Sequence, residues 1–571
     1  MPRERKRIGD ILVESKIITP QQLEEILQLQ KETNKKLGEI LVEKGIISED
    51  ELVELLEFQL GIPHIKLDIY PIDPKAIDFV SEQLARRHTL IPVGFDEEDN
   101  LIVAMADPLN IFAIEDVEIY SGRRVVPRIA RASDIIRAIE RYYGKQETLK
   151  AVEELQKETS ERETAGRRVQ ITPRFQLGLE DGTEGPVVRL VNSIFEQAIT
   201  SRASDIHIEP FENHVKVRYR IDGVLYDVLK LDISILPSLT ARIKVVGNMD
   251  IAEKRVPQDG RTTYILYDRI YDMRISSLPT VFGEKIVVRV IDKSAFVKSK
   301  TELGLTKDDL EKYEKLIAAP HGIILVCGPT GSGKSTTLYT ILNELNTGLR
   351  NIITVEDPVE STIEGINQVE VNVKAGLTFA AALRSILRQD PDIIMIGEIR
   401  DKETADMAIR AAITGHLVLS TIHTNDAASA VTRLVDMGID NFLISSSLVG
   451  VISQRLVRKL CPYCKVEYEA NEEEKMLLDI ESENVVKLYK KDGCHICEGK
   501  GYFGRTGIYE ILLVTRELRK LINKKDVSSE EIKELAIKEG MKTLKEACRE
   551  RVLSGITSVE EFLKVTYAIE S

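Results

Sequence analysis

Residues 322–342 read Gly-Ile-Ile-Leu-Val-Cys-Gly-Pro-Thr-Gly-Ser-Gly-Lys-Ser-Thr-Thr-Leu-Tyr-Thr-Ile-Leu, and this stretch decides the fold of the region around it. The apolar run Ile323–Val326 has strand character, a glycine-punctuated loop follows at Gly328–Gly333, and a helix is expected to begin at Lys334. This is the P-loop pattern G-x-x-x-x-G-K-[ST] in its strand, loop and helix context. The pattern and its flanks together favour a site for ATP or GTP over a purely structural turn.

Each part of this loop has a predicted role at a triphosphate. Glycines let backbone N–H groups converge on phosphate oxygens, and the positive end of the following helix favours negative charge. The Lys334 ammonium is expected to reach the β and γ phosphates, and the Ser335 hydroxyl is expected to bind Mg²⁺. The predicted nucleotide-binding residues are Gly328, Pro329, Thr330, Gly331, Ser332, Gly333, Lys334, Ser335 and Thr336.

The composition indicates a charge-rich multidomain protein. A length of 571 residues suffices for about three or four domains. The formal net charge of -14 disfavours an extended nucleic-acid surface. The longest uncharged apolar stretch, Phe442–Ile452, is short for a bilayer span, and the charged N-terminus lacks the apolar core of a signal peptide. We therefore expect a cytoplasmic protein that meets a membrane only through protein partners.

Residues 7–59 contain a repeat with an offset of 29 positions. The recurring set is Arg7, Gly9, Leu12 and Gln30, and then Lys36, Gly38, Leu41 and Gln59. Each copy includes a helix whose start fits a capping box, one at Thr19 and one at Ser48. Two interpretations stay open: two helical hairpins packed as a small core, or a site for a ligand with two similar halves.

The chain after the repeat alternates between structured and polar segments. Residues 90–95 and 101–106 predict a hairpin, and residues 132–143 predict a helix. Residues 146–186 are rich in Lys, Glu, Gln, Thr and Gly and predict a mobile tether. A helix over 187–201 then precedes alternating runs typical of an antiparallel sheet with helices on one side.

Further strand-like stretches after the P-loop end in polar residues. Glu356 ends one stretch, Glu398 occupies the Walker B position of the next, and His416 and His423 flank a third. Because parallel strands carry ligand groups at their carboxyl ends, we expect Glu356, Glu398 and His423 to converge on the phosphate loop. Either glutamate could hold Mg²⁺ or position the attacking water, and a histidine could sense the γ phosphate. The alternatives are strand-end caps for the glutamates and buried, hydrogen-bonded histidines.

Four of the six cysteines form two C-x-x-C pairs, Cys461 with Cys464 and Cys494 with Cys497. Four thiolates can close a tetrahedral zinc site and leave no position open for water, which predicts a structural metal. Disulfides are the less favoured alternative because no secretion signal is predicted. The isolated Cys327 and Cys548 are predicted to be core residues.

These motifs resemble those of a known family. Four stretches are similar to the sequence boxes of the secretion ATPase superfamily, in the branch of the GspE and PilB ATPases. The P-loop resembles the Walker A box, and the Asp box is resembled by Thr-Val-Glu-Asp-Pro-Val-Glu. The Walker B box is resembled by Gly-Glu-Ile-Arg-Asp, and the His box by Gly-His-Leu-Val-Leu-Ser-Thr-Ile-His-Thr-Asn. The resemblance implies an α/β multidomain fold. Its parts would be an MshEN-type N-terminal domain at 1–145, a linker at 146–186, a PAS-like α+β middle domain at 187–300, and a RecA-like motor domain at 301–571 with a zinc insert at 460–500 and a helical tail.

The resemblance further implies a hexameric, Mg²⁺-dependent ATP hydrolase in which one subunit's middle domain acts on the next subunit's motor domain. Arg274 and Arg289 map to the arginines supplied in trans, and Arg384 and Arg388 are the motor-domain candidates. Such an arginine can raise turnover by about a thousandfold or more.

The N-terminal repeat resembles the cyclic di-GMP binding domain of the MshEN type. The resemblance places Arg7 and Lys36 at the guanine and phosphate ends of the ligand and lets Gly9 and Gly38 approach it closely. Leu12, Leu41, Gln30 and Gln59 would line the site. The second copy departs from the family at Lys36, where arginine is usual, and a lysine lacks the flat stacking surface of a guanidinium.

The implied function is assembly of a pilus or pseudopilus from the cytoplasmic face of the inner membrane. The zinc insert favours the assembly branch of the family. The implied partners are further copies of the chain, a platform protein resembling PilC or GspF, and an adaptor resembling PilM or GspL, with no nucleic acid. Three alternatives stay open: a type II secretion ATPase, a nucleic-acid translocase, and a cyclic di-GMP receptor with a degenerate motor.

Overall fold

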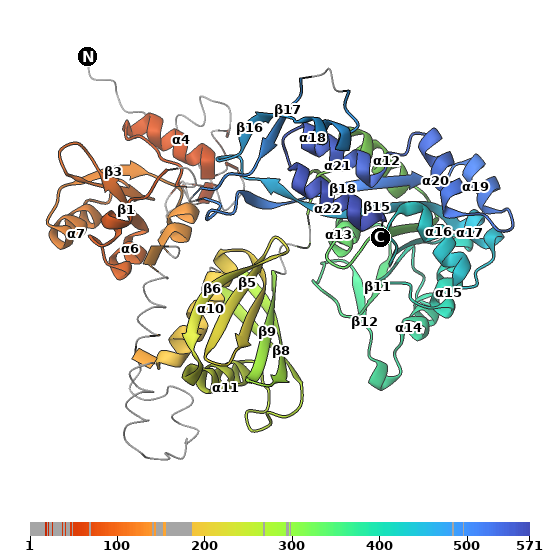
Figure 1. Ribbon diagram of the computed structural model, residues 1–571, viewed down its shortest axis with the longest axis horizontal. Coiled ribbons are helices and arrows are strands. Elements are labelled where there is room, and N and C mark those ends of the chain that lie inside the picture. Colours follow the sequence, from red (N-terminus) through yellow and green to blue (C-terminus); the bar gives the residue numbers. More distant parts are fainter. Residues whose placement is uncertain are drawn as a thin grey trace. The chain divides into compact units, whose positions relative to one another are not determined.

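The structure, a computed structural model, describes residues 49–67, 70–139, 142–143, 185–266, 269–292, 296, 298–481, 485–494 and 496–570, with a few isolated residues elsewhere. The chain divides into two compact units, one of residues 1–262 and 273–290, the other of residues 263–272 and 291–571. Helices accompany mixed sheets in both units, so the predicted α/β class is confirmed (Figure 1).

A three-stranded sheet forms the centre of the N-terminal part. Its elements are α4 (Glu49–Leu60), α5 (Pro74–Ile77), α6 (Glu82–His88), β1 (Leu90–Phe95), β2 (Leu101–Met105), α7 (Ile111–Ser121) and β3 (Val125–Ile129). Strands β1 and β2 form the predicted antiparallel hairpin. The Asp96 carboxylate stabilises its turn by accepting hydrogen bonds from the backbone N–H groups of Glu98 and Asn100, each 2.9 Å long. Strand β3 pairs with β2 in parallel, and α7 connects them.

The middle domain is a six-stranded sheet, in the order β6-β5-β4-β9-β8-β7, packed against helices. Its elements are α10 (Pro186–Thr200), β4 (Ala203–Pro210), β5 (His214–Ile221), β6 (Val224–Asp232), α11 (Leu236–Val246), β7 (Gln258–Leu266), β8 (Arg269–Thr280) and β9 (Gly283–Asp292). Buried and half-exposed residues alternate along β5. Tyr219, from the buried set, donates a 2.7 Å hydrogen bond to the carbonyl oxygen of Ile194 in α10. One sheet face therefore packs on the helix, and the other carries charged side chains.

The motor domain is built on a seven-stranded sheet in the order β12-β11-β13-β14-β10-β15-β18. Its strands are β10 (Gly322–Cys327), β11 (Ile352–Glu356), β12 (Asn367–Glu370), β13 (Ile393–Ile396), β14 (Leu417–Ile422), β15 (Leu448–Leu460) and β18 (Tyr502–Leu513). All neighbouring strands pair in parallel except β15 and β18, which are antiparallel. The carboxyl ends of the parallel strands therefore share one edge, as the sequence predicted.

Helices cover both faces of this sheet. They are α12 (Lys307–Ile317), α13 (Lys334–Leu345), α14 (Phe379–Ile386), α15 (Lys402–Ile413), α16 (Ala427–Asp436), α17 (Asn441–Ser447), α19 (Arg516–Ile522), α20 (Ser529–Lys538), α21 (Leu544–Leu553) and α22 (Val559–Glu570). Strand β10 shows why both faces need cover. Its residues Ile323 and Leu325 belong to one buried cluster, and Ile324 and Val326 belong to another. The continuous apolar run of β10 follows from this burial on both faces.

The long β15–β18 hairpin carries the cysteine insert at its far end. Between the two strands lie β16 (Val466–Glu469), α18 (Glu472–Leu477) and β17 (Lys487–Lys490), with β16 and β17 paired antiparallel. Across the described residues, every helix is too short or too polar to cross a membrane.

Candidate active site

The P-loop backbone is shaped by glycines in the left-handed region. Gly328, Gly331 and Gly333 have φ values of +140°, +78° and +91°. A Cβ atom on Gly328 would lie 2.4 Å from the carbonyl oxygen of Gln454, so only glycine fits there. Helix α13 begins at Lys334 without a side-chain cap. Its first N–H groups are therefore left for an anionic ligand.

Lys334 folds back over this loop. Its Nζ atom donates hydrogen bonds to the carbonyl oxygens of Gly328 (2.8 Å) and Pro329 (3.0 Å). Burial lowers the pKa of Lys334, while Cys327 and Glu398 act in the opposite direction. The buried Oγ atom of Ser332 has no hydrogen-bond partner among the described residues. Glycines, an uncapped helix and an ammonium group together fit a bound triphosphate.

Gln454 on β15 braces the loop, and the sequence interpretation did not identify it. Its Nε2 atom donates to the carbonyl oxygen of Ser332 (2.8 Å), and its Oε1 atom accepts from the Thr337 hydroxyl (2.7 Å). The side chain therefore ties β15 to both the loop and α13. A buried polar residue within an apolar strand was the only signal for it in the sequence.

Glu398 lies after β13, and its carboxylate, only 13% exposed, faces two partners. The Arg400 guanidinium lies 2.5 Å from Oε1, and His423 Nε2, which follows β14, lies 3.6 Å from Oε2. Burial, Lys334 and Arg400 lower the pKa of His423, although Glu398 opposes this. The net direction of the pKa shift favours the neutral imidazole. The structure brings Lys334, Glu398 and His423 together, and it adds Arg400, which the sequence interpretation gave no role.

Glu356 is held in a different environment at the end of β11. Its buried carboxylate accepts hydrogen bonds from Tyr339 (2.5 Å), Thr354 (2.6 Å) and Gln368 (3.1 Å). The N–H group of Gly397 donates to the neighbouring Val355 carbonyl (2.8 Å), which joins the ends of β11 and β13. Glu356 therefore lies beside the segment that carries Glu398, but its oxygens are occupied by structural donors.

His416 lies at the opposite end of β14 from His423. Its Nδ1 atom is 2.8 Å from the carbonyl oxygen of Ala411, in the last turn of α15. This contact matches the alternative interpretation of the sequence, in which the histidine forms a structural hydrogen bond.

The two motor-domain arginine candidates lie on the surface around α14. Arg384, 57% exposed, forms an ion pair with Glu403. Arg388 donates a 2.8 Å hydrogen bond to the carbonyl oxygen of Arg384. Within the described part of the chain, neither is bonded to the P-loop or to Glu398.

The two middle-domain candidates lie on neighbouring strands. Arg274 is half-buried on β8, and Arg289 on β9 has a side chain that is 65% exposed. The Nε atom of Arg289 lies 3.3 Å from a carboxylate oxygen of Asp205.

The proposed cyclic di-GMP residues Arg7, Gly9, Leu12, Gln30, Lys36 and Gly38 lie outside the described residues. Leu41 is buried in a small cluster with Ile18, Ile26, Ile40 and Ile47, and Gln59 is half-buried on α4. A small apolar core of this kind is compatible with both interpretations of the repeat. The ligand-lining roles stay a prediction.

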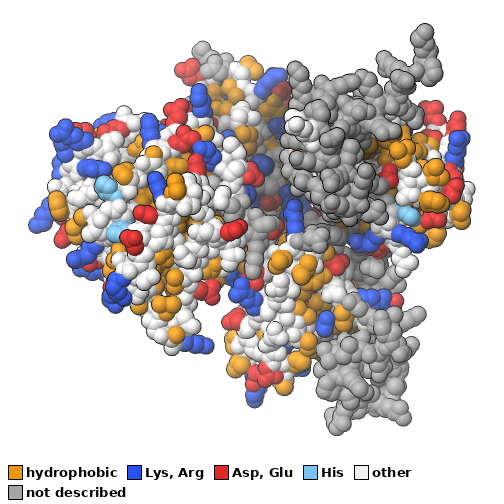
Figure 2. Space-filling model, turned by 180° about the vertical axis from the view of Figure 1, so that it is seen from behind, with side chains coloured by type: hydrophobic (Ala, Val, Ile, Leu, Met, Phe, Trp, Pro, Cys, Tyr) orange, Lys and Arg blue, Asp and Glu red, His pale blue; other side chains and the backbone are white. Residues whose placement is uncertain are grey.

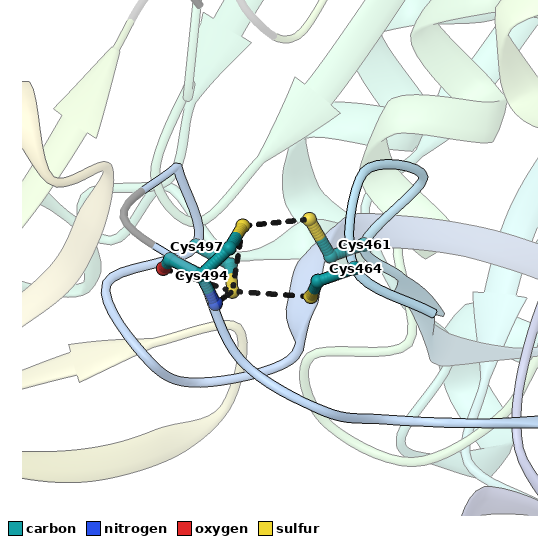
Figure 3. Close-up of side chains that lie close together, drawn as sticks. All are labelled: Cys461, Cys464, Cys494 and Cys497. Carbon is teal, nitrogen blue, oxygen red and sulfur yellow. Dashed lines mark hydrogen bonds between the residues drawn. The ribbon is translucent and has the colours of Figure 1, made fainter. Parts of the chain in front are cut away.

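The two C-x-x-C pairs meet at the end of the β15–β18 hairpin (Figure 3). Their sulfurs lie 3.8 Å apart for Cys461 and Cys494, 3.7 Å for Cys464 and Cys497, and 3.7 Å for Cys494 and Cys497. All four lie within 4.8 Å of one another, and none forms a disulfide. A tetrahedral ion with zinc–sulfur bonds of about 2.3 Å requires sulfurs about 3.8 Å apart, so the set fits zinc.

Backbone amides support a thiolate at Cys497. The N–H groups of Cys494 and Gly501 donate to its Sγ atom at 3.2 and 3.1 Å. Burial alone would raise the pKa of Cys497, but these hydrogen bonds lower it overall. Cys327 and Cys548 are buried, as predicted for core residues.

Fold and site define a P-loop ATPase with a RecA-like core. The model of the type II/IV secretion system protein family matches residues 180–564, and the model of the MshEN domain matches residues 60–149, downstream of most of the repeat. The chain belongs to the type II/IV secretion system protein family, and it is an ATPase of that family.

Two relatives show how far the similarity extends. The type IV pilus assembly ATPase PilB of Myxococcus xanthus is 42% identical over 564 residues, covering 97% of this chain and 98% of that protein. The type II secretion system ATPase E of Vibrio cholerae is 50% identical over 388 residues, covering 68% of this chain and 77% of that protein.

A solved structure supports the fold alone. The Legionella pneumophila ATPase DotB is 21% identical, with a TM-score of 0.51, over 68% of this chain and 98% of that one.

Proposed function

We propose that this ATPase is a homohexameric motor that powers assembly of a type IV pilus from the cytoplasmic face of the inner membrane. The convergence of Lys334, Glu398 and His423 beside the P-loop carries the hydrolytic part of the proposal. The pilus part rests on similarity along almost the whole chain to a pilus assembly ATPase, the PilB protein of Myxococcus xanthus.

The motor-domain residues divide the work of hydrolysis. Lys334 and the free N–H groups of α13 neutralise the phosphates, and the hydroxyl of Ser335 would hold Mg²⁺, which supplies charge neutralisation to the leaving phosphate. Glu398 is proposed to orient the attacking water, because its carboxylate is mostly buried and interacts electrostatically with Lys334. Glu356 ties the end of β11 to α13 and β12 through its hydrogen bonds with Tyr339 and Gln368. His423 can donate a hydrogen bond from a ring N–H group to the γ phosphate.

The remaining positive charge would come from an adjoining subunit. Arg289 is exposed and stands on a different unit of the chain from the P-loop. Arg274 on the next strand is its proposed partner, and Arg384 and Arg388 are proposed to contact the nucleotide or the neighbouring subunit from the motor side. In a ring in which each middle domain contacts the motor domain of the next subunit, all four arginines would have a role.

Two further ligands complete the proposal. Zinc bound by Cys461, Cys464, Cys494 and Cys497 would close the end of the β15–β18 hairpin as a structural ion. Cyclic di-GMP bound by the N-terminal repeat would regulate the motor, with Lys36 in place of arginine weakening its affinity.

The proposed partners are an inner-membrane platform protein and an adaptor, and nucleic acid is not among them. On the face drawn in Figure 2, lysine and arginine side chains are interspersed with acidic ones. Such a mixed surface does not favour a polyanion. Hydrolysis stimulated by DNA would instead support a translocase.

A type II secretion ATPase is the second candidate. The 50% identity to the Vibrio cholerae enzyme over 388 residues favours it. Deleting the gene in its own host separates the two. Loss of surface pili, restored by the intact gene but not by Lys334→Ala, would support pilus assembly. Retention of normally secreted proteins with pili intact would support type II secretion and overturn the pilus proposal.

A further inference from the structure

Asp205 lies between two arginines on the charged face of the middle-domain sheet. Its strand β4 pairs with β5 on one side and β9 on the other, and Asp205 stands directly opposite Arg220 and Arg289. One carboxylate oxygen lies 3.3 Å from the Nε atom of Arg289, and the other lies 3.5 Å from the Nε atom of Arg220. The Ser204 hydroxyl donates to the same carboxylate at 2.8 Å. Asp205 is thus a fixed acceptor centred between the two arginines.

The two arginines differ in how much they depend on this carboxylate. Arg220 also donates a 3.0 Å hydrogen bond to the carbonyl oxygen of Gly223, so the β5–β6 turn holds it independently. Arg289 bonds to Asp205 through Nε, and its two terminal nitrogens have no hydrogen-bond partner among the described residues. Its side chain is 65% exposed, whereas that of Asp205 is 13% exposed. Asp205 therefore holds the Nε atom of an exposed guanidinium whose terminal nitrogens have no partner among the described residues.

We propose that Asp205 is a positioning residue for Arg289, and that it presents the terminal nitrogens of this arginine to a phosphate on the adjoining subunit. The inference rests on the proposed role of Arg289 in trans. An arginine side chain loses about 2 kcal/mol of rotamer entropy when it is held in one geometry. A carboxylate that holds Nε imposes part of this order before the nucleotide arrives, and it leaves the bidentate edge free for phosphate oxygens.

Two other carboxylates on this face of the sheet, Glu209 and Asp227, pair with cations other than Arg289. Glu209 pairs with Arg218 at 2.6 Å and with Lys285 at 2.8 Å. Asp227 on β6 pairs with Lys216 at 2.8 Å. Within the described residues, neither carboxylate is bonded to Arg274 or Arg289. Asp227 therefore offers a matched control in the same sheet.

The test compares full-length Asp205→Asn, Asp205→Glu and Asp227→Asn. We expect Asp205→Asn to lower kcat by about three- to tenfold, the range of a partly exposed charged hydrogen bond. KM for ATP and binding of a fluorescent ATP analogue stay unchanged, because the neighbouring P-loop holds the nucleotide. Asp205→Glu restores part of the rate, and Asp227→Asn keeps the normal rate. Circular dichroism and light scattering check folding and assembly.

The double variant identifies the route of the effect. If Asp205 acts through Arg289, then Asp205→Asn adds no further loss of kcat in an Arg289→Ala background. An equal further loss there, or a normal kcat for Asp205→Asn alone, overturns the inference. The underlying proposal that Arg289 acts in trans is tested by Arg289→Ala alone, because a normal kcat for that variant would show that Arg289 has no role in hydrolysis. A low kcat for Arg289→Ala together with a normal kcat for Asp205→Asn would reject only the positioning role of Asp205.

Discussion

The motor domain and the middle domain carry their charged groups in opposite ways. In the motor domain, Glu398 is 13% exposed and contacts Arg400 and His423, which come from the same sheet edge. In the middle domain, Arg289 is 65% exposed, and its one partner among the described residues is Asp205 on the same sheet. The Glu398 carboxylate is largely buried, although Arg400 and His423 are 66% and 53% exposed, whereas the Arg289 guanidinium is presented to solvent.

Under the proposed function, this difference corresponds to a division of the reaction between two surfaces. A carboxylate beside an ammonium can organise a nucleotide within one chain. An exposed guanidinium with unoccupied terminal donors can complete the site only when another surface reaches it. Binding should therefore depend on the motor domain alone, and the rate of hydrolysis should depend on both domains.

The largest effect is expected from Lys334→Ala, which breaks the motor half. Removing the ammonium takes away the charge that neutralises the phosphates, so ATP turnover should fall below detection and nucleotide affinity should fall with it. Phosphate release and binding of a fluorescent ATP analogue measure the two effects. Lys520→Ala, which removes an exposed lysine paired with Glu517, should change neither. Turnover by Lys334→Ala would show that another cation does this work.

Arg289→Ala should break the middle-domain half. We expect kcat to fall by about a thousandfold with nucleotide binding intact, because a trans arginine acts on the transition state. Steady-state hydrolysis and analogue binding on the assembled protein provide the measurement. Lys230→Ala removes an exposed cation from the same sheet and is expected to be silent. Weaker binding in Arg289→Ala would contradict the division between the domains.

A pair of glutamate variants sharpens the comparison within the motor domain. Glu398→Gln should lower kcat by about a hundredfold while leaving Tm unchanged, since the carboxylate orients the attacking water. Glu356→Gln places an amide group among three hydrogen-bond donors, so it should cost about 1–3 kcal/mol of folding stability. Thermal unfolding and hydrolysis assays separate the two outcomes. A rate loss with full stability in Glu356→Gln would give that residue the chemical role.

The smallest effect on hydrolysis is expected at the cysteine insert. Zinc content should be about one ion per chain and should be lost in Cys494→Ser. A loss of about 2 kcal/mol would lower Tm by roughly 4–8 °C in a domain of this size. Elemental analysis measures the zinc content, and calorimetry measures Tm. Cys548→Ser is the control, because it changes a cysteine outside the cluster and should keep the zinc. Full zinc occupancy in Cys494→Ser would remove this residue from the ligand set.

Much of the motor fold could be predicted because its signals are local. The apolar run of β10, the loop glycines and the helix start at Lys334 lie within one continuous stretch, and the structure places them as strand, loop and helix. The hairpin of β1 and β2 could be predicted for the same reason. Gln454 was missed because its partners, Ser332 and Thr337, are set by strand order, which local spacing does not encode. Arg400 was missed although its partner Glu398 lies only two residues earlier, because spacing alone does not show that the two side chains meet.

The sequence by itself determined the phosphate loop, the acidic strand ends and the two C-x-x-C pairs, because each is a short pattern whose chemistry depends on near neighbours. Only the tertiary structure decided that Glu356 pairs with Tyr339 while Glu398 faces His423. It also decided that Asp205 stands between Arg220 and Arg289. These partners come from other elements of the fold, helix α13 for Tyr339 and neighbouring strands for the rest. Burying both faces of the motor sheet and the helix-facing side of the middle sheet brings those elements together.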